Sequence, residues 1–323
     1  MHQYLARRLL AAIPVLLLAS VWIFGLMRFL PGDAVWTKLA SDAESRFDPE
    51  VAAELRRQLG LDQPYHVQYW EWISGIVLRG DMGRSFFSKE TVADEILKRV
   101  PVTLELALGT TLVALAIAIP VGIVAAIRQD TGMDYVGRVG AIIGLAVPNF
   151  WLGTLLLLLP AIWFGYTPPF GYVNAWENPG ETLRLFAFPC LALGASFAAS
   201  IMRMTRSQLL EVLRQDYIRT AWAKGLRERV VVFRHALKNA LIPVVSVVGV
   251  QIGHLLGGSV VIETVFGLPG LGALTVFAIR QRDYPVIQGV VLLLALTFVL
   301  VNLAVDFWYA WLDPRIRYGE AAT

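Results

Sequence analysis

Long apolar stretches alternate with polar segments along this chain. An apolar helix needs about 20 residues to cross a hydrocarbon core of about 30 Å. Six stretches approach or exceed that length, and they span residues 9–30, 102–127, 139–165, 185–202, 240–262 and 286–305. The pattern predicts an all-α polytopic membrane protein with six transmembrane helices, and an even number of spans places both termini on one side of the bilayer.

Composition supports this class and excludes others. Hydrophobic residues make up 56% of the 323 residues and charged residues only 16%, which are unusual values for a soluble chain. The net charge of +3 suits anionic lipid headgroups, and no nucleic-acid partner is implied. Cys190 is the only cysteine, so an intrachain disulfide is excluded. Because no metal-ligand spacing occurs, we expect no metal site and no catalytic residue.

The Lys and Arg residues predict the orientation, because short cytoplasmic loops are enriched in them. Arg7 and Arg8 precede the first span, and Arg128 and Arg138 lie in the loop after the second. The polar stretch 203–238 follows the fourth span and holds nine Lys or Arg against three Asp or Glu. Two spans separate each of these regions from the next, so all three lie on one side of the bilayer, and we predict that they and both termini are cytoplasmic.

A signal peptide is the alternative interpretation of the N-terminus, since two arginines precede an apolar run. The run is longer than such a peptide requires, and no cleavage site of small residues closes it. We therefore expect an uncleaved membrane anchor.

The polar segment 31–100 falls on the opposite, extracytoplasmic side and contains short amphipathic pieces. Asp48 can cap a helix that Gly60 can end. Val51, Leu55 and Leu59 recur every four residues and predict an apolar stripe. We expect a small helical cap between the first and second spans, with this stripe packed on the membrane domain.

Glycines, prolines and ionisable groups within the spans have mainly structural interpretations. Four glycines in the fifth span favour close helix packing over a pathway lining, and they are Gly249, Gly253, Gly257 and Gly258. Four prolines lie within the apolar runs, and they are Pro120, Pro148, Pro160 and Pro189. Three charged residues lie near span ends, where they can reach the interface, and they are Arg28, Glu105 and Asp306. His254 is more central and is interpreted as a packed residue.

The cytoplasmic stretch 203–238 contains a pattern of helix, glycine and helix. Its centre reads QDYIRTAWAKGL at residues 215–226 and continues with RHALKNALIP at 234–243. Tyr217, Ile218, Ala221 and Trp222 lie on one face of a short helix, and Gly225 permits a sharp turn after it. On periodicity alone, a helix that lies on the lipid headgroups is an equally good interpretation.

This stretch resembles the coupling loop of ABC importer permeases, and motifs along almost the whole chain extend the resemblance. The chain is similar to the first of the two permease subunits in the dipeptide/oligopeptide/nickel family, DppB- or OppB-like. The motifs are YLARRLL at 4–10, RFLPGDA at 28–34, QLGLDQP at 58–64, GDMGRS at 80–85, LLGGSVVIE at 255–263, FGLPGLG at 266–272, RDYPVIQG at 282–289 and LDPRIR at 312–317. One departure is Trp222, where the family usually places Arg or another small or polar residue.

The resemblance implies the type I ABC importer permease fold in a bacterial cytoplasmic (inner) membrane. It implies an N-terminus and first helix at 1–30, a cap at 31–100, a permease core at 101–311 with the coupling loop at 203–239, and a cytoplasmic tail at 312–323. ATPase coupling is expected within residues 214–226. The site residues are Asp216, Tyr217, Ile218, Arg219, Thr220, Ala221, Trp222, Ala223, Lys224, Gly225 and Leu226.

The same resemblance implies the partners and the activity. The partners are a homologous second permease, two ABC ATPases, an extracytoplasmic solute-binding protein and a peptide solute. The activity is import of that peptide by alternating access. ATP and Mg²⁺ would bind to the ATPases, because this chain has no Gly-x-x-x-x-Gly-Lys-Ser/Thr loop and is expected to be neither an enzyme nor a cofactor-binding subunit.

Alternative substrates within this machinery are a nickel chelate, glutathione or an oligosaccharide. An ion-coupled secondary transporter is the alternative from another class, but it would require inverted repeats and buried carboxylates near mid-membrane. Neither feature is evident in the sequence.

Overall fold

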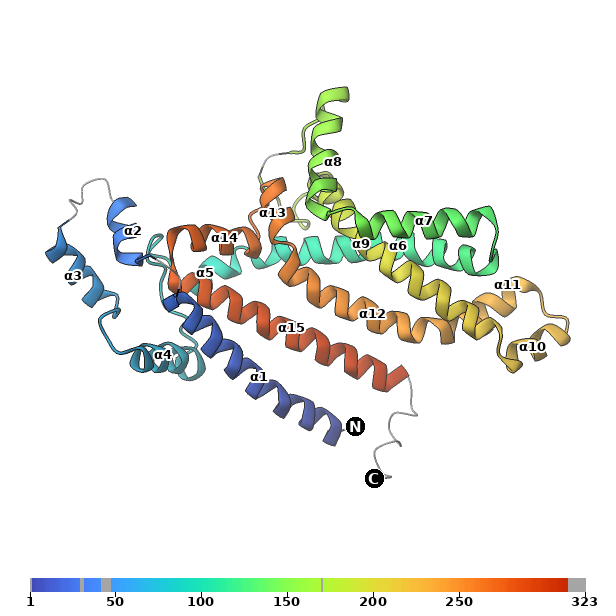
Figure 1. Cartoon of the computed structure of the whole chain (residues 1–323), viewed down its shortest axis with the longest axis horizontal. Helices are drawn as coiled ribbons and strands as arrows, with labels where there is room; N and C mark the ends of the chain where they lie inside the picture. Colours follow the sequence, from blue (N-terminus) through green and yellow to red (C-terminus); the bar gives the residue numbers. More distant parts are fainter. Residues whose placement is uncertain (1, 30–31, 42–47, 170, 313–323) are drawn as a thin grey trace. The chain divides into compact units, whose positions relative to one another are not determined.

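The computed structural model describes residues 2–29, 32–41, 48–169 and 171–312, and these residues are almost entirely helical (Figure 1). One isolated antiparallel bridge pairs Arg84 with Thr91. The helices, with two π-helical turns labelled η, are α1 His2–Phe29, α2 Ala34–Ser41, α3 Pro49–Gln58, α4 Tyr65–Ser74, η1 Gly75–Arg79, α5 Val92–Leu97, α6 Val100–Ile127, α7 Gly132–Ala146, α8 Asn149–Phe164, α9 Pro179–Leu213, α10 Asp216–Ala223, α11 Glu228–Val230, η2 Val231–Ala236, α12 Leu237–Gly258, α13 Val260–Phe266, α14 Leu271–Gln281 and α15 Tyr284–Leu312.

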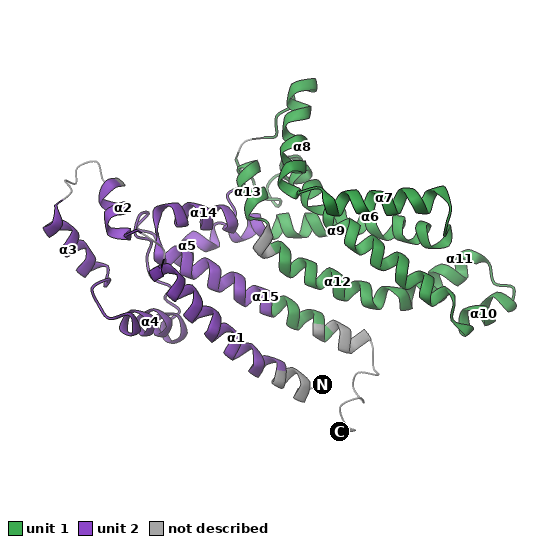
Figure 2. Cartoon of the chain, viewed as in Figure 1, with its two compact units in different colours: residues 1, 104–268, 300–323 green, residues 2–103, 269–299 purple. Residues whose placement is uncertain are grey.

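Two compact units divide these helices (Figure 2). Unit 1 comprises Met1, Leu104–Leu268 and Leu300–Thr323, and unit 2 comprises His2–Thr103 and Pro269–Val299. Helices α6 and α15 therefore each contribute residues to both units. The two units are described separately below.

Among the residues that the structure describes, five helices are long and apolar enough to cross a membrane, and two bent helix pairs raise the number to as many as seven. The five are Arg8–Phe29, Val92–Ile127, Pro179–Leu213, Glu228–Leu255 and Tyr284–Val305. The expected count of six falls within this range. The expected span at 139–165 is not one straight helix, however, because α7 and α8 meet at 98°.

Pro148 gives the physical reason for this bend. Val147 has an extended backbone with ψ of 123°, as expected for a residue that precedes a proline, and Pro148 then occupies the N-cap position of α8. The prolines at 120, 160 and 189 lie inside continuous helices instead. The FGLPGLG motif spans the break between α13 and α14, which was not anticipated from the sequence.

The longest helix, α9, organises unit 1. It packs against α7, α8 and α12, and Ala198, Ala199 and Met202 contribute to a core shared with α6, α7 and α12. With 35 residues, α9 is about 50 Å long, which exceeds the hydrocarbon core of about 30 Å. Its C-terminal turns can therefore project out of the membrane and lead directly into α10.

A buried ion pair joins α7 to this extended part of α9. Asp134 has a fully buried side chain and accepts bonds from Arg206 Nε and Nη2, each at 2.7 Å. The backbone N–H of Asp130 donates a third bond to this carboxylate at 3.0 Å. Because both carboxylate oxygens are satisfied, the pair fixes the α6–α7 connection against α9.

In unit 2, Asp48 caps α3 as predicted, and its carboxylate accepts a bond from the backbone N–H of Glu50 at 2.8 Å. The predicted apolar stripe is wrong at Val51, which is 45% exposed. Leu55 and Leu59 pack with Ala52 against α2, which supplies Val35 and Leu39. Ala52, rather than Val51, therefore joins Leu55 and Leu59 on the buried face of α3. This face packs on α2.

Two of the family motifs meet in unit 2. Ser85, from GDMGRS, donates a hydrogen bond to Asp283, from RDYPVIQG, and the backbone N–H of Phe86 donates another at 3.2 Å. Burial raises the pKa of the Asp283 carboxyl above its ordinary value, although both bonds oppose this shift. The pairing joins two segments of this unit that are about 200 residues apart in sequence.

Packing also accounts for part of the glycine stripe. Gly249 lies directly against Val305 of α15 within unit 1, so a side chain at this position would collide with that valine. Gly253 is buried. The structure does not describe the surroundings of Gly257, Gly258 and Asp306. The tail 313–323, with most of the LDPRIR motif, also lies outside the described residues.

We expect Asp134→Asn to lower stability by about 3 kcal/mol, because it leaves a largely buried arginine without its counter-charge. The matched control is Asp216→Asn, which removes the exposed Asp216–Arg219 pair at 3.3 Å and should change stability by less than about 1 kcal/mol. Thermal unfolding of the purified protein in detergent measures both. Equal midpoints for the two variants would contradict the structural importance of the buried pair.

Candidate functional site

The candidate site is α10, a helix of eight residues just beyond the C-terminal end of α9 (Figure 1). Gln215 precedes it in an extended conformation, and Asp216 in the first turn complements the positive end of the helix dipole. Lys224 caps its C-terminal end. A helix this short is not stable by itself in water, so packing must hold it in place.

Two side chains supply that packing. Ile218 is fully buried and Ala221 is 7% exposed, and both belong to an apolar cluster with Leu209 of α9 and Val231 and Val232 of η2. The same cluster includes residues of α6 and α12, namely Ile123, Ala126 and Ala240. The cluster therefore joins α10 to three long helices of unit 1.

The other site residues of α10 remain at the surface. Tyr217 and Trp222 are each 44% exposed and flank the buried pair, although the sequence pattern placed all four on one apolar face. We call the exposed set the outer face of α10. It consists of Asp216, Tyr217, Arg219, Thr220, Trp222 and Ala223. The apolar face thus has two parts, one that holds the helix and one that is available to a partner.

Polar contacts order this outer face. The side-chain amide of Asn239, on α12, donates to the Tyr217 hydroxyl at 2.8 Å and so fixes the ring. The Thr220 hydroxyl donates to the backbone carbonyl of Asp216 at 3.0 Å. Arg219 reaches Asp216 at 3.3 Å, but both side chains are largely exposed, so this pair contributes little to stability.

A tight turn follows the helix. Gly225 has φ of +74°, a left-handed conformation that favours glycine, and its N–H donates to the carbonyl of Trp222 at 2.9 Å. Leu226 is half-buried and packs on the cluster that holds α10. The chain then continues through α11 into the π-helical turn η2, whose residues belong to the cluster that holds α10, so both ends of α10 are attached to the same packed core.

Positive charge surrounds the outer face. Exposed basic side chains precede, accompany and follow α10, and they are Arg214, Arg219, Lys224, Arg227, Arg229, Arg234 and Lys238. Such an arrangement can steer an acidic partner surface, and it mainly affects encounter rate and orientation. The outer face of α10 thus combines two half-exposed aromatic residues with a surrounding rim of basic side chains.

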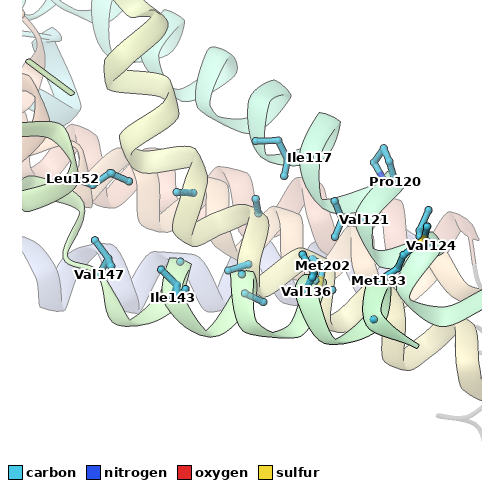
Figure 3. A pocket seen from close by; sticks show the side chains of 18 of the residues that line it. Ile117, Pro120, Val121, Val124, Met133, Val136, Ile143, Val147, Leu152 and Met202 are labelled. Carbon is cyan, nitrogen blue, oxygen red and sulfur yellow. The ribbon is translucent and has the colours of Figure 1, made fainter. Parts of the chain in front are cut away.

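The large groove in unit 1 has different properties. It has a volume of about 970 Å³ and is lined by apolar side chains of α6, α7, α8 and α9, among them Val121, Val136 and Met202 (Figure 3). No titratable side chain is among its described lining residues. Its described lining is apolar throughout.

The described residues also contain no group of three or more His, Cys, Asp and Glu side chains that could hold a metal ion. Glu105 on α6 accepts a bond from the backbone N–H of Ala175 at 3.3 Å and so ties the loop before α9 to α6. Burial and the nearby charge of Glu105 raise the pKa of Tyr172 in this loop to about 12. His254 lies exposed on α12 rather than packed in the core.

Sequence reasoning missed two features that position the site. The Asn239–Tyr217 bond joins residues 22 positions apart, and no local pattern predicts it. Asp134 lay just outside the apolar run that was counted as a span, so its pairing with Arg206 was not considered. The only sequence signal for this ion pair was a charged residue, Asp134, shortly before an apolar run.

Comparisons with known proteins agree with this picture. Residues 118–318 match the family "Binding-protein-dependent transport system inner membrane component", and residues 1–107 match its N-terminal membrane component family. The chain is 44% identical over 318 residues to the glutathione transport system permease protein GsiC of Salmonella choleraesuis, covering 98% of this chain and all of that protein. It is 42% identical, with the same coverage, to GsiC of Escherichia coli K12.

A solved structure gives the same fold at low sequence identity. The MetNI methionine ABC transporter in an inward-facing conformation matches with a TM-score of 0.53 and 18% identity, covering 67% of this chain and 95% of that chain. The fold of this chain is therefore that of a transporter membrane subunit. This chain is a member of the family of binding-protein-dependent inner membrane components and is an ABC importer permease subunit.

We expect the two parts of the α10 apolar face to respond differently to truncation. Ile218→Ala should lower stability by about 2–4 kcal/mol, because it opens a cavity in a closed cluster. Trp222→Ala removes a larger side chain but an exposed one, so the change should stay within about 1 kcal/mol. Thermal unfolding in detergent measures both, and a greater loss for Trp222→Ala would contradict the division of the face.

Proposed function

We propose that α10 couples ATP hydrolysis to transport by docking on an ABC ATPase through its outer face. The observation that carries this proposal is the combination of a buried anchor, Ile218 and Ala221, with exposed Tyr217 and Trp222 on the same helix. A rigid attachment lets displacement of α10 move α9 and α12 with it. A mobile helix would absorb the same displacement and transmit little.

The proposed complex contains a homologous second permease, two ABC ATPases and an extracytoplasmic solute-binding protein. ATP and Mg²⁺ bind to the ATPases, and this chain contributes the pathway and the coupling segment 214–226. The binding protein delivers solute to the outer side. ATP binding and hydrolysis shift the population between outward-open and inward-open states, because the ATPases bind the two states with different affinity.

The topology completes this proposal. Both termini, the tail at 312–323 and the loop 203–239 lie in the cytoplasm, while the cap at 31–100 faces outward. The distribution of Lys and Arg supports this orientation. Exposed large apolar side chains on α1, α6 and α7, such as Trp22, Leu112 and Ile142, suit contact with lipid or with the second permease.

The proposed solute is a short peptide. Its support is the resemblance to peptide permeases and the similarity to proteins named glutathione permeases, because glutathione is itself a peptide of three residues. A nickel chelate and an oligosaccharide remain alternatives for the same machinery. An ion-coupled secondary transporter is not favoured, because the family match is to a binding-protein-dependent system.

Uptake into proteoliposomes tests the solute. With the assembled transporter, its binding protein and internal ATP, we expect labelled dipeptides or glutathione to accumulate, and a nickel chelate or a trisaccharide should not. The control omits ATP. Accumulation of the trisaccharide or the chelate alone would contradict the peptide proposal and leave the coupling proposal standing.

Trp222→Ala and Tyr217→Ala test the coupling. Central aromatic residues often contribute about 2 kcal/mol or more to an interface, so each variant should retain the ATPases at least about tenfold more weakly during co-purification. The matched control is Trp176→Ala, which alters a tryptophan that is 91% exposed in the loop before α9. Full ATPase retention by both α10 variants would show that the outer face does not dock.

A further inference from the structure

A second, smaller cavity lies entirely within unit 2. It has a volume of about 230 Å³, well above the roughly 15 Å³ that one water molecule requires. Its walls come from the C-terminal end of α1, from α4 and η1, from the GDMGRS segment and from the first turns of α15. We call it the Arg28 pocket, and the residues that matter here are Arg28, Gln68, Trp72, Tyr284 and Gln288.

The polar atoms in this pocket are unusual. Eight buried side-chain nitrogen or oxygen atoms of the described residues have no hydrogen-bond partner, and four of them belong to residues that line this one cavity. They are Nε and Nη1 of Arg28, Nε1 of Trp72 and Nε2 of Gln288. All four are donors, and the Gln288 side chain is only 4% exposed. Buried donors are normally paired, so the cluster indicates a missing acceptor.

The Arg28 guanidinium is held in a fixed position. The Arg28 Nη2 group donates to Oε1 of Gln68. The Gln68 side chain is buried, and its Nε2 donates to the backbone carbonyl of Gln63 at 2.6 Å. The rings of Phe24 and Tyr284 lie 4.8 Å and 5.0 Å from the guanidinium carbon. These contacts use the faces and one nitrogen of the group, and they leave the other two nitrogens for a ligand.

The charges around the pocket define what would fit. A fixed positive charge with neighbouring N–H donors favours a carboxylate. Glu71 and Asp81 also line the pocket and are exposed, so carboxylates are available for a positively charged group of the same ligand. Arg28 and Arg79 balance these two acids, and a ligand with no net charge is therefore favoured over a strongly charged anion.

We propose that the Arg28 pocket binds the carboxylate of a small zwitterionic solute, such as an amino acid or a short peptide. Arg28, Trp72 and Gln288 would donate to the carboxylate, and Glu71 and Asp81 would receive the ammonium group. The choice of a peptide ligand rests on the proposed function, whereas the need for an acceptor follows from the pocket alone. The site is separate from α10 in sequence and belongs to the other unit.

Calorimetric titration of the assembled transporter in nanodiscs, without binding protein, tests this proposal with three probes. We expect Ala-Ala to bind, Ala-Ala amide to bind at least tenfold more weakly because it lacks the carboxylate, and inorganic phosphate not to compete. Equal binding of the dipeptide and its amide, no dipeptide binding, or binding of phosphate alone would each overturn the proposal.

Gln288→Met identifies the site. The variant removes an unpartnered donor at nearly constant size, so the ligand-free protein should keep or slightly raise its melting temperature, while dipeptide affinity falls about tenfold or more. The matched control, Gln129→Met, changes an exposed glutamine in the α6–α7 connection and should leave both values unchanged. A lower melting temperature with unchanged affinity would show that Gln288 only supports the fold and would overturn the proposal.

Peptide uptake separates this inference from the proposed function. Wild-type transporter that accumulates peptide but shows no dipeptide binding at the pocket would refute the pocket alone. Dipeptide binding that Gln288→Met abolishes, in a transporter that accumulates no peptide, would support the pocket and refute the peptide transport proposal.

Discussion

The burial of Ile218 and Ala221 in one cluster with residues of α6, α9, η2 and α12 holds α10 in place. A helix of eight residues has too few internal bonds to persist alone, so its position depends on these two contacts. Because the contacts reach three long helices, α10 shares one packed cluster with α6, α9 and α12. The outer face can expose aromatic side chains because the buried Ile218 and Ala221 hold the helix in place.

The membrane imposes the second constraint. Backbone groups in hydrocarbon must be bonded within their own helix, so the spans are long and continuous, and breaks occur where proline or glycine forces them. Helix α9 satisfies this constraint and is also about 20 Å longer than the hydrocarbon requires. The buried Asp134–Arg206 pair secures its projecting part to α7, so the support of α10 is electrostatic as well as apolar.

The sequence was sufficient for features that depend on local composition. Apolar run length predicted the class and most spans, Asp48 predicted a helix start, and the QDYIRTAWAKGL pattern predicted a short helix before a glycine turn. Features that depend on distant partners were not accessible. The bend at Pro148, the burial of Ala52 in place of Val51 and the split between Ile218 and Trp222 all require knowledge of which surface faces each side chain.

Thiol labelling at α10 tests the central claim most directly, and the chain suits it because its single cysteine, Cys190, is buried. Trp222→Cys and Ile218→Cys would be labelled with a charged maleimide in the isolated permease and in the assembled transporter. The account predicts that Trp222→Cys reacts rapidly alone and is protected by the ATPases, while Ile218→Cys is unreactive in both. Unchanged labelling of Trp222→Cys after assembly would contradict docking through the outer face of α10.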